Sequence, residues 1–368
     1  MPPRVVLFGA TGYTGRLAAR ELRGTDPPAV LAGRDRRRLE ALAGELGGGF
    51  EVAVADSASP ASVRALVGEG DVLVTTVGPY LLHGRAAVEA ALAAGAHYLD
   101  AAGEPPFLRQ VFEEHGPRAQ GRCALVPAFG YDFVPGNLAG ALALREAGEE
   151  ATAVAVGYFA SGGGGFSTGT LASGAGLLLE RSFAWRGGRL VRDRVASRVR
   201  AFPVRGRAWL AVSYGGSEHY ALPRLAPGLR DVDVYLGWFG RRSRAVQAAS
   251  TLGAPLAHVP GAGAAGRAVA RALARRTGGG PEEPARQASR CFVIAVAAAA
   301  DGRELAQVRL RGPNVYTLTG RLLAWGARRA AAGGVAGTGA LGPVEAFGLE
   351  ALGGAADAAG LHRIGADD

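Results

Sequence analysis

A glycine-rich turn between a strand and a helix constrains the first part of this chain most strongly. The apolar run RVVLFG at 4–9 leads into GATGYTG at 9–15, and a helical pattern follows. Gly9, Gly12 and Gly15 permit a tight turn and a close approach of the backbone to a pyrophosphate, which a helix start binds through its N–H groups. Because the chain holds 58 glycines, a chance match is the alternative. The strand before the turn and the helix after it favour a dinucleotide-binding turn.

Strand-like and helical segments alternate over the first 130 residues. Short apolar runs that are typical of buried strands lie at 4–9, 29–33, 51–56, 71–78, 97–104 and 123–128. Segments with a helical pattern lie between them, at 16–24, 37–46, 59–68 and 84–95. An alternation of this kind, with right-handed crossovers, predicts a doubly wound parallel sheet of the Rossmann type.

The pattern changes in the second half of the chain. A strand-like run at 152–160 is followed by alternating apolar and polar segments between 188 and 238. Residues 291–312 are typical of a hairpin that turns at Asp301 and Gly302. These segments predict a second, α+β domain built on a mostly antiparallel sheet.

Arg34 follows the second predicted strand, at the position that faces the 2′ oxygen of the adenosine ribose in a Rossmann domain. An NAD enzyme usually has a carboxylate there, whereas a guanidinium can bind a 2′-phosphate through two parallel hydrogen bonds. The alternative is the solvated start of the next helix, a role that we assign to Arg37 and Arg38 and in part to Arg36. Asp35 is expected to cap that helix. Arg34 therefore favours NADP over NAD.

The basic residues of the chain exclude several classes of function. All 41 of them are arginine, the formal net charge is +9, and the arginines are scattered among few aromatic residues. A scattered distribution argues against nucleic acid as a partner. The absence of lysine from the sequence excludes an internal Schiff base, a Walker A lysine and the Tyr-x-x-x-Lys pair of short-chain dehydrogenases.

Cysteine use and hydropathy indicate a reduced protein without a membrane span. Cys123 and Cys291 lie in apolar, strand-like stretches and lack metal-ligand spacing, so we expect buried thiols and no metal site. No apolar run reaches the roughly 18–20 residues of a membrane helix. The opening MPPRVVLFG is typical of a strand and not of a signal peptide. We therefore expect a cytoplasmic protein with no integral membrane segment.

Several further blocks, taken in order with the glycine turn, resemble one enzyme family. The blocks are GATGYTGR (9–16), LAGR (31–34), VGPYLLHG (77–84), HYLDAAGE (97–104), PAFGYDFVPGNL (127–138), GGFSTGTLAS (164–173) and GALGPVEAFG (339–348). On these blocks the chain resembles the saccharopine dehydrogenase-like oxidoreductases, and within them the actinobacterial branch that includes trans-acting acyl enoyl reductases. The order and spacing of the blocks carry this resemblance more than any single block does.

The resemblance implies NADP(H) as the cofactor and a division into two domains. We expect an NADP-binding Rossmann domain over residues 1–135, completed by a C-terminal return segment over about 340–368. An α+β domain over 136–339 is expected to bind the substrate and to carry any homodimer contact. Its sheet and the 161–173 loop are expected to shape the substrate cleft.

The candidate site residues lie at the carboxyl ends of the predicted strands, where open α/β sheets bind ligands. The candidate cofactor ligands are Gly9, Thr11, Gly12, Tyr13, Thr14, Gly15, Arg34, Asp56, Val77, Gly78 and Pro79. Tyr80, His83 and Asp132 are the candidate catalytic residues, since each can supply a proton. Asp100 and Glu104 end the fifth strand. For Asp100 and Asp132 the alternative is a structural role, capping a helix or binding backbone N–H groups.

The resemblance implies an NADPH-dependent reductase. Our first hypothesis is a trans-acting enoyl reductase that reduces a C=C bond of an acyl or polyketide-type substrate, either a small molecule or bound to a carrier. Reduction of an imine (C=N), the chemistry of the family's namesake, is the alternative. The same resemblance places Gly78, Pro79 and Tyr80 near the nicotinamide, where a plain turn is the alternative.

Two other classes of function remain as remote alternatives. Residues 165–169 match the G-x-S-x-G pattern of a nucleophile elbow around Ser167, but a flexible glycine run separates them from the preceding predicted strand. A serine hydrolase is therefore disfavoured. A non-catalytic NADP-binding protein is the other alternative, because a fold does not fix a function.

Overall fold

The computed structural model describes residues 2–162, 181–253 and 279–365. Contacts between residues divide the chain into two compact units. The first unit consists of Met1–Gly103, Phe107–Asp132 and Tyr316–Ala355. The second unit consists of Glu104–Pro106, Phe133–Val315 and Ala356–Asp368.

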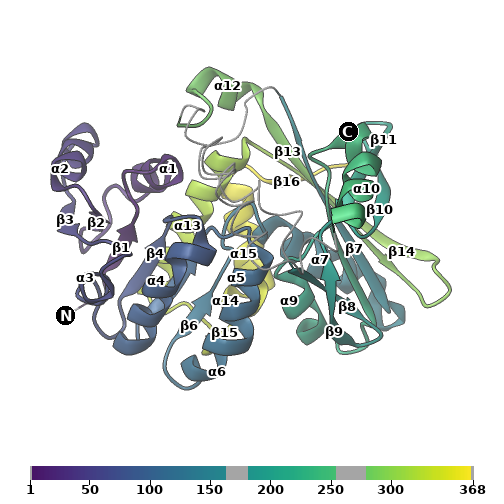
Figure 1. Cartoon of the computed structure of the whole chain (residues 1–368), viewed down its shortest axis with the longest axis horizontal. Helices are drawn as coiled ribbons and strands as arrows, with labels where there is room; N and C mark the ends of the chain where they lie inside the picture. Colours follow the sequence, from purple (N-terminus) through teal and green to yellow (C-terminus); the bar gives the residue numbers. More distant parts are fainter. Residues whose placement is uncertain (1, 163–180, 254–278, 366–368) are drawn as a thin grey trace. The chain divides into compact units, whose positions relative to one another are not determined.

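The first unit is built on a sheet, called sheet A, in which seven of the described strands pair in parallel in the order β15-β6-β5-β4-β1-β2-β3 (Figure 1). The strands are β1 (Val5–Phe8), β2 (Val30–Gly33), β3 (Glu51–Val54), β4 (Val72–Thr75), β5 (His97–Asp100), β6 (Ala124–Val126) and β15 (Gly339–Ala340). β1, β2 and β4 are buried along their whole length, as expected for strands covered on both faces. The predicted doubly wound parallel sheet is confirmed.

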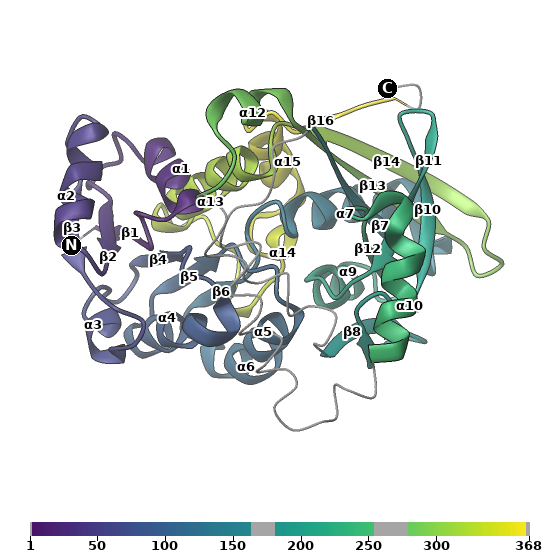
Figure 2. The ribbon, with the colours of Figure 1, turned by 45° about the horizontal axis from the view of Figure 1, so that its top comes forward.

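Helices cover both faces of sheet A. The helices that lie wholly or mostly in the first unit are α1 (Tyr13–Glu21), α2 (Arg36–Glu45), α3 (Pro60–Arg64), α4 (Tyr80–Ala94), α5 (Pro105–Gln110), η1 (Val111–His115), α6 (Gly116–Ala119), α13 (Val315–Ala331), α14 (Pro343–Phe347) and α15 (Leu349–Ala358). α1 and α2 lie on one face and α3 and α4 on the other (Figure 1, Figure 2). Asp35 caps α2, because its side chain accepts a hydrogen bond from the Arg38 N–H at 3.1 Å. The predicted cap is confirmed.

Helix α13 makes its contacts in the first unit from Tyr316 onward. A Cβ added to Gly320 would lie 3.1 Å from the backbone carbonyl carbon of Leu17, so α13 and α1 approach each other closely. The predicted second domain ran to residue 339 and included this helix, whereas the contacts place the return segment at 316–355. The helical pattern in the sequence of α13 indicates an apolar face, but it does not indicate which element packs against that face.

The second unit is built on a sheet, called sheet B, in which nine of the described strands pair. The strands are β7 (Ala153–Ser161), β8 (Arg181–Arg186), β9 (Arg189–Arg194), β10 (Val199–Val204), β11 (Arg207–Ser213), β12 (Asp231–Leu236), β13 (Arg290–Ala298), β14 (Glu304–Gly312) and β16 (His362–Arg363). All pairs are antiparallel except β12 with β7, so the predicted mostly antiparallel sheet is confirmed. β13 and β14 form the predicted hairpin, with Gly302 in the left-handed region at φ +87°.

Both faces of sheet B are packed. α7 (Val134–Ala147) packs against β7, β13 and β14, and α9 (Glu218–Leu225) packs against α7 and β12. The other face of this sheet is covered by a buried hydrophobic cluster that includes Phe159, Phe202 and Ile294. The other helices that the structure describes in this unit are η2 (Gly148–Glu150), η4 (Gly240–Arg242), α10 (Ser243–Gly253) and α12 (Glu283–Ala288). Both cysteines are buried free thiols, as the sequence predicted.

Candidate functional site

The glycine turn after β1 is closely packed, and packing or backbone conformation explains why each of these positions is a glycine. Gly9 has φ +90°, and a Cβ there would lie 2.8 Å from Thr76 Oγ1. The Gly12 N–H donates to the Gly9 carbonyl at 2.9 Å and closes the turn. A Cβ on Gly15 would collide with the Gly9 carbonyl oxygen and lie 2.9 Å from Ala10 Cα. These contacts exclude larger residues from the turn, as a dinucleotide turn requires.

The start of α1 is prepared for an anion. Gly12 is the N-cap residue, and no side chain caps the helix. The first turn contains no acidic residue, so the positive end of the helix dipole is not neutralised there. Tyr13 and Thr14 begin the helix at this point, and the Tyr13 ring packs edge-on against Tyr316 with 5.0 Å between the ring centroids. The residues present therefore fit the pyrophosphate of a dinucleotide.

The segment after β4 lies beside the glycine turn. The Thr76 hydroxyl donates to the Gly9 carbonyl at 3.1 Å, and the Val77 N–H donates to Thr75 Oγ1 at 3.3 Å. A Cβ on Gly9 would also lie 2.8 Å from a Val77 methyl. The structure thus brings the predicted residue Val77 next to Gly9, and Gly78 and Pro79 follow it in the chain. The sequence analysis did not identify Thr76 as a site residue, although Thr76 lies at the carboxyl end of the predicted strand at 71–78.

Arg34 stands directly after β2 with its side chain exposed. No hydrogen bond or ion pair engages its guanidinium within the described ranges. Thr11 lies beside the same strand end, because a Cβ on Gly33 would be 4.0 Å from its Oγ1. Arg36, by contrast, pairs with Glu40 at 3.7 Å along α2. An exposed guanidinium at this strand end fits a 2′-phosphate.

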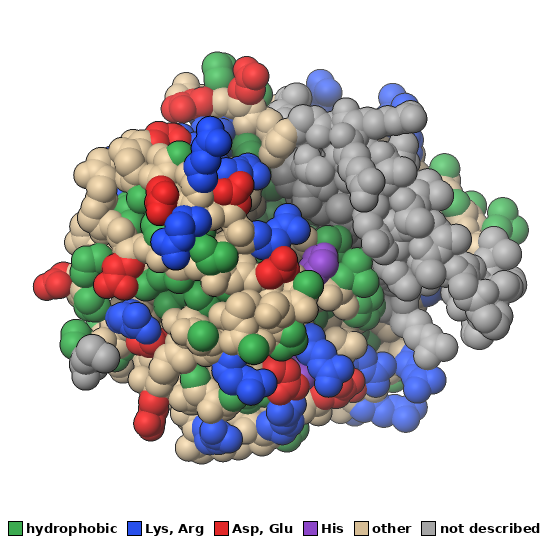
Figure 3. All heavy atoms as spheres, turned by 60° about the vertical axis from the view of Figure 1, so that its left-hand side comes forward, with side chains coloured by type: hydrophobic (Ala, Val, Ile, Leu, Met, Phe, Trp, Pro, Cys, Tyr) green, Lys and Arg blue, Asp and Glu red, His purple; other side chains and the backbone are tan. Residues whose placement is uncertain are grey.

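Charges on the surface of the first unit are mixed in sign. Arg16 and Arg20 both pair with Glu45, the latter at 3.6 Å. On the face drawn in Figure 3, acidic side chains lie among the basic ones. Basic and acidic side chains are therefore interspersed on this face.

Asp56 shapes the turn after β3. Its carboxylate accepts a hydrogen bond from the Ala58 N–H at 2.9 Å, and its own N–H donates to Ser62 Oγ at 3.0 Å. These bonds give Asp56 a structural task at the carboxyl end of β3. Its predicted contact with the cofactor stays a prediction.

Tyr80 begins α4, and its hydroxyl joins two strand ends. The side chain is buried at 6% exposure, and its hydroxyl donates to the Thr75 carbonyl at 3.1 Å and accepts from the Ala101 N–H at 3.3 Å. The ring also packs against Phe107, with 5.7 Å between the ring centroids. A buried hydroxyl bonded to two backbone groups holds the ends of β4 and β5 together and is poorly placed to give up a proton.

We expect Tyr80→Phe to lower the free energy of unfolding by about 1–3 kcal/mol, because two buried backbone groups lose a hydrogen-bond partner. Urea unfolding of the wild type and the variant measures this change. The affinity for NADPH should stay within about twofold, well under the 1.4 kcal/mol that a tenfold change represents. A variant with unchanged stability and abolished turnover would instead make Tyr80 the proton donor.

His83 and Asp100 are also engaged by neighbouring groups. His83 Nδ1 lies 3.2 Å from the Ser57 hydroxyl, so the imidazole links α4 to the turn after β3. Asp100 is fully buried, and its Oδ1 accepts hydrogen bonds from the Ala102 N–H at 2.8 Å and the Ala128 N–H at 2.7 Å. Asp100 therefore has the structural role that the sequence analysis gave as its alternative. Glu104 is buried and belongs to the second unit.

Asp132 is the candidate catalytic carboxyl. Its side chain is half-buried, and its Oδ1 is buried without a hydrogen-bond partner among the residues that the structure describes. Burial raises the pKa of this carboxyl to about 7, because the charged carboxylate loses hydration. A Cβ added to Gly103 would lie 3.1 Å from Oδ2, so Asp132 packs against the segment after β5. Asp132 is the predicted candidate whose state is suited to proton transfer near neutral pH.

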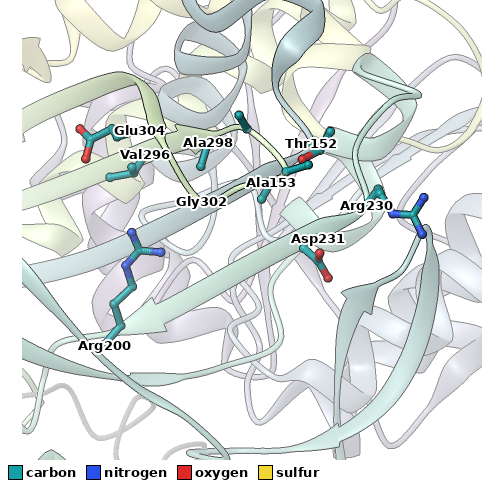
Figure 4. A pocket seen from close by; sticks show the side chains of 11 residues that line it. Thr152, Ala153, Arg200, Arg230, Asp231, Val296, Ala298, Gly302 and Glu304 are labelled. Carbon is teal, nitrogen blue, oxygen red and sulfur yellow. The ribbon is translucent and has the colours of Figure 1, made fainter.

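The second unit contains a pocket with a volume of about 440 Å³. Its charged lining consists of Arg200, Arg230, Asp231 and Glu304 (Figure 4). With two positive and two negative side chains, this lining does not favour a ligand of either charge. None of the predicted site residues lines this pocket. The predicted substrate loop at 161–173, with Ser167, lies outside the described residues apart from its first two positions.

Among the described residues there is no group of three or more metal-ligating side chains that could hold a metal ion. In the same part of the chain, no helix has the length and apolarity to cross a membrane. The glycine turn, the uncapped start of α1 and Arg34 together define a dinucleotide-binding α/β protein.

Comparison with known families identifies that class further. Residues 5–124 match the model of the saccharopine dehydrogenase NADP binding domain. This segment is therefore similar to the NADP binding domain of saccharopine dehydrogenase. The match covers most of sheet A and includes the glycine turn and Arg34.

Curated relatives match part of the chain. A trans-acting enoyl reductase of Mycobacterium ulcerans is 36% identical over 154 residues, which are 40% of this chain and 37% of that protein. The corresponding protein of Mycobacterium leprae is 37% identical over 140 residues, 36% of this chain and 34% of that protein. A Mycobacterium tuberculosis protein, also named as a trans-acting enoyl reductase, is 38% identical over 179 residues, 46% of this chain and 42% of that protein. The chain thus spans about two fifths of the length of these relatives.

A solved structure matches the whole chain in fold. It is apo saccharopine dehydrogenase (L-Glu forming) from Saccharomyces cerevisiae, with a TM-score of 0.58 and 13% identity. The match covers 98% of this chain and 99% of that chain. At this identity the likeness shows the fold alone, and it confirms the expected combination of a doubly wound sheet with a second α+β part.

Proposed function

We propose that this protein is an NADPH-dependent oxidoreductase. The observation that carries the proposal is the carboxyl edge of sheet A, where Arg34 lies beside the glycine turn with no ion-pair or hydrogen-bond partner among the described residues. When bound there, NADPH supplies a hydride. Gly9 to Gly15 and the start of α1 would hold the pyrophosphate, Arg34 the 2′-phosphate, and residues 77–79 would flank the nicotinamide.

We propose Asp132 as the proton donor that accompanies hydride transfer. Tyr80 and His83 were the other candidates, but the Tyr80 hydroxyl bonds two backbone groups and His83 bonds Ser57. Asp132 Oδ1 has no such partner in the described part of the chain, and a pKa of about 7 keeps part of the population protonated at neutral pH. A donor whose pKa lies near the working pH is effective in general acid catalysis.

The substrate that we propose is an enoyl thioester of an acyl or polyketide-type chain, small or attached to a carrier. Relatives named trans-acting enoyl reductases support this choice. Hydride addition at the β carbon gives an enolate, which is protonated at the α carbon to complete reduction of the C=C bond. The alternative is an imine, in which carbon accepts the hydride and nitrogen takes the proton. We also propose a cytoplasmic location and a homodimer.

The experiment that tests this proposal is NADPH consumption with a panel of short enoyl thioesters and cyclic imines. We expect consumption with an enoyl thioester and a product heavier by two hydrogens. Consumption with imines only would favour the alternative substrate. NADPH binding without consumption by any member of either class would favour a non-catalytic NADP-binding protein.

A further inference from the structure

Three backbone N–H groups of the segment that carries Asp132 donate hydrogen bonds to other parts of the first unit. After β6, the Ala128 N–H donates to Asp100 Oδ1 at 2.7 Å and the Phe129 N–H to the Asp100 carbonyl at 2.6 Å. The third bond lies next to Asp132. There the Tyr131 N–H donates to the Thr319 hydroxyl at 3.0 Å. The two bonds to Asp100 fix the start of the segment, and the bond to Thr319 fixes its end.

Thr319 fits closely against this segment. It lies on α13 with 8% of its surface exposed, and its bond to Tyr131 is buried. A Cβ added to Gly130 would lie 2.8 Å from the Thr319 methyl and 3.1 Å from its hydroxyl oxygen. Glycine at 130 therefore allows Thr319 to touch the backbone. This contact leaves the residues before Asp132 little freedom to shift.

The same helix contacts the start of the cofactor site. Tyr316, one turn before Thr319, packs edge-on against Tyr13 at the start of α1. Gly320 lets α13 approach the backbone of α1 at Leu17. Helix α13 is thus a common support for the dinucleotide turn and for the segment that ends in Asp132, although 188 positions separate Tyr131 from Thr319.

We propose that Thr319 is a positioning residue that sets the placement of the Asp132 carboxyl through its hydrogen bond to the Tyr131 N–H. This inference rests on the proposed role of Asp132 as proton donor. The hydroxyl of Thr319 is the feature that matters, because a side chain of equal size without it would fill the same space and leave the Tyr131 N–H without this acceptor.

Thr319→Val tests the proposal, because valine keeps the shape and removes the acceptor. Once the segment loosens, water reaches the Asp132 carboxyl, and its pKa falls from about 7 toward the ordinary aspartate value. We expect a fall of at least about one pH unit, since loss of burial removes the cause of the shift. Carbon-13 NMR titration of labelled aspartate, with Asp132→Asn to assign the signal, measures this without any need for turnover.

The kinetic readout separates positioning from simple loss of stability. At pH 7 we expect kcat of Thr319→Val to fall roughly tenfold, while KM for NADPH stays within about twofold, because only the proton-transfer step loses its alignment. Thr319→Ser keeps the hydroxyl and should recover most of kcat and the raised pKa. Thr338→Val is the matched control. Its hydroxyl also accepts a backbone N–H, that of Gly121 at 2.8 Å, but at the strand starts of β6 and β15.

The outcomes distinguish this proposal from the proposed function. A fall in the Asp132 pKa in Thr319→Val, absent in Thr319→Ser and Thr338→Val, supports positioning even if the wild type reduces no substrate in the panel. In that case the proposed reductase function is wrong, and the proposed positioning role of Thr319 is retained. An Asp132 pKa that stays the same in Thr319→Val, or that falls equally in Thr338→Val, overturns the proposal.

Discussion

Replacing Asp132 with asparagine is expected to lower kcat by about 10²–10⁴-fold, the usual contribution of a general acid. Asparagine keeps the shape of the side chain but cannot deliver the proton. The affinity for NADPH should stay within about twofold, because the phosphate-binding residues are untouched. Steady-state kinetics with NADPH and the accepted substrate, together with a fluorescence titration of NADPH, measure both quantities.

The pH dependence of the wild type gives the sign of the Asp132 effect. Burial raises the pKa of this carboxyl to about 7, so the protonated donor is present below that pH and is lost above it. The rate should therefore be highest on the acid side and fall as the pH rises through 7. Asp357→Asn, at an exposed carboxylate beside His362, is the control and should leave the profile unchanged. A profile that keeps its fall near pH 7 in Asp132→Asn would contradict this assignment.

Replacing Arg34 with glutamine is expected to weaken NADPH binding by about 1.5–3 kcal/mol, roughly a 10- to 150-fold rise in Kd, the value of hydrogen bonds to a charged group. The guanidinium of Arg34 has no partner in the described part of the protein, so its donors are available to the 2′-phosphate. NADH lacks that phosphate, and its Kd should barely change. Isothermal titration of both cofactors measures the difference.

Arg37→Gln is the matched control for Arg34→Gln. Arg37 is also exposed and stands three residues later, in the first turn of α2. It should have little effect on either cofactor, apart from a small long-range loss of positive charge. If Arg34→Gln weakened NADPH and NADH equally, Arg34 would be acting on a part of the cofactor common to both.

Much of the fold could be predicted from the sequence, because local patterns determine it. Apolar runs of strand length alternate with helical patterns through residue 130, and that order allows few arrangements other than a doubly wound sheet. Asp301 and Gly302 likewise marked the β13–β14 hairpin, since that turn needs a residue with positive φ. The place of α13 could not be predicted, because Gly320 and Tyr316 show their partners on α1 only once the chain is folded.

The geometry around the proposed cofactor residues was more predictable than the geometry around the proposed catalytic residues. Gly9, Gly15 and Arg34 depend on the geometry of one turn and one strand end, which the sequence order provides. The roles of Tyr80 and Asp132 depend on whether a polar atom has a partner after folding. Tyr80 is bonded to Thr75 and Ala101, whereas Asp132 Oδ1 is buried without a bond among described residues. Residue type alone could not separate these two cases.

Transfer of deuterium from NADPH labelled at the nicotinamide C4 tests the proposed reaction most directly. The wild-type protein would be incubated with each C4-labelled form of NADPH and a reactive enoyl thioester, and the product analysed by mass spectrometry and NMR. We predict that one of the two labelled forms delivers deuterium to the β carbon and that the α carbon takes its hydrogen from solvent. A protein that binds NADPH tightly yet transfers no deuterium to enoyl thioesters or imines would contradict the proposed oxidoreductase function.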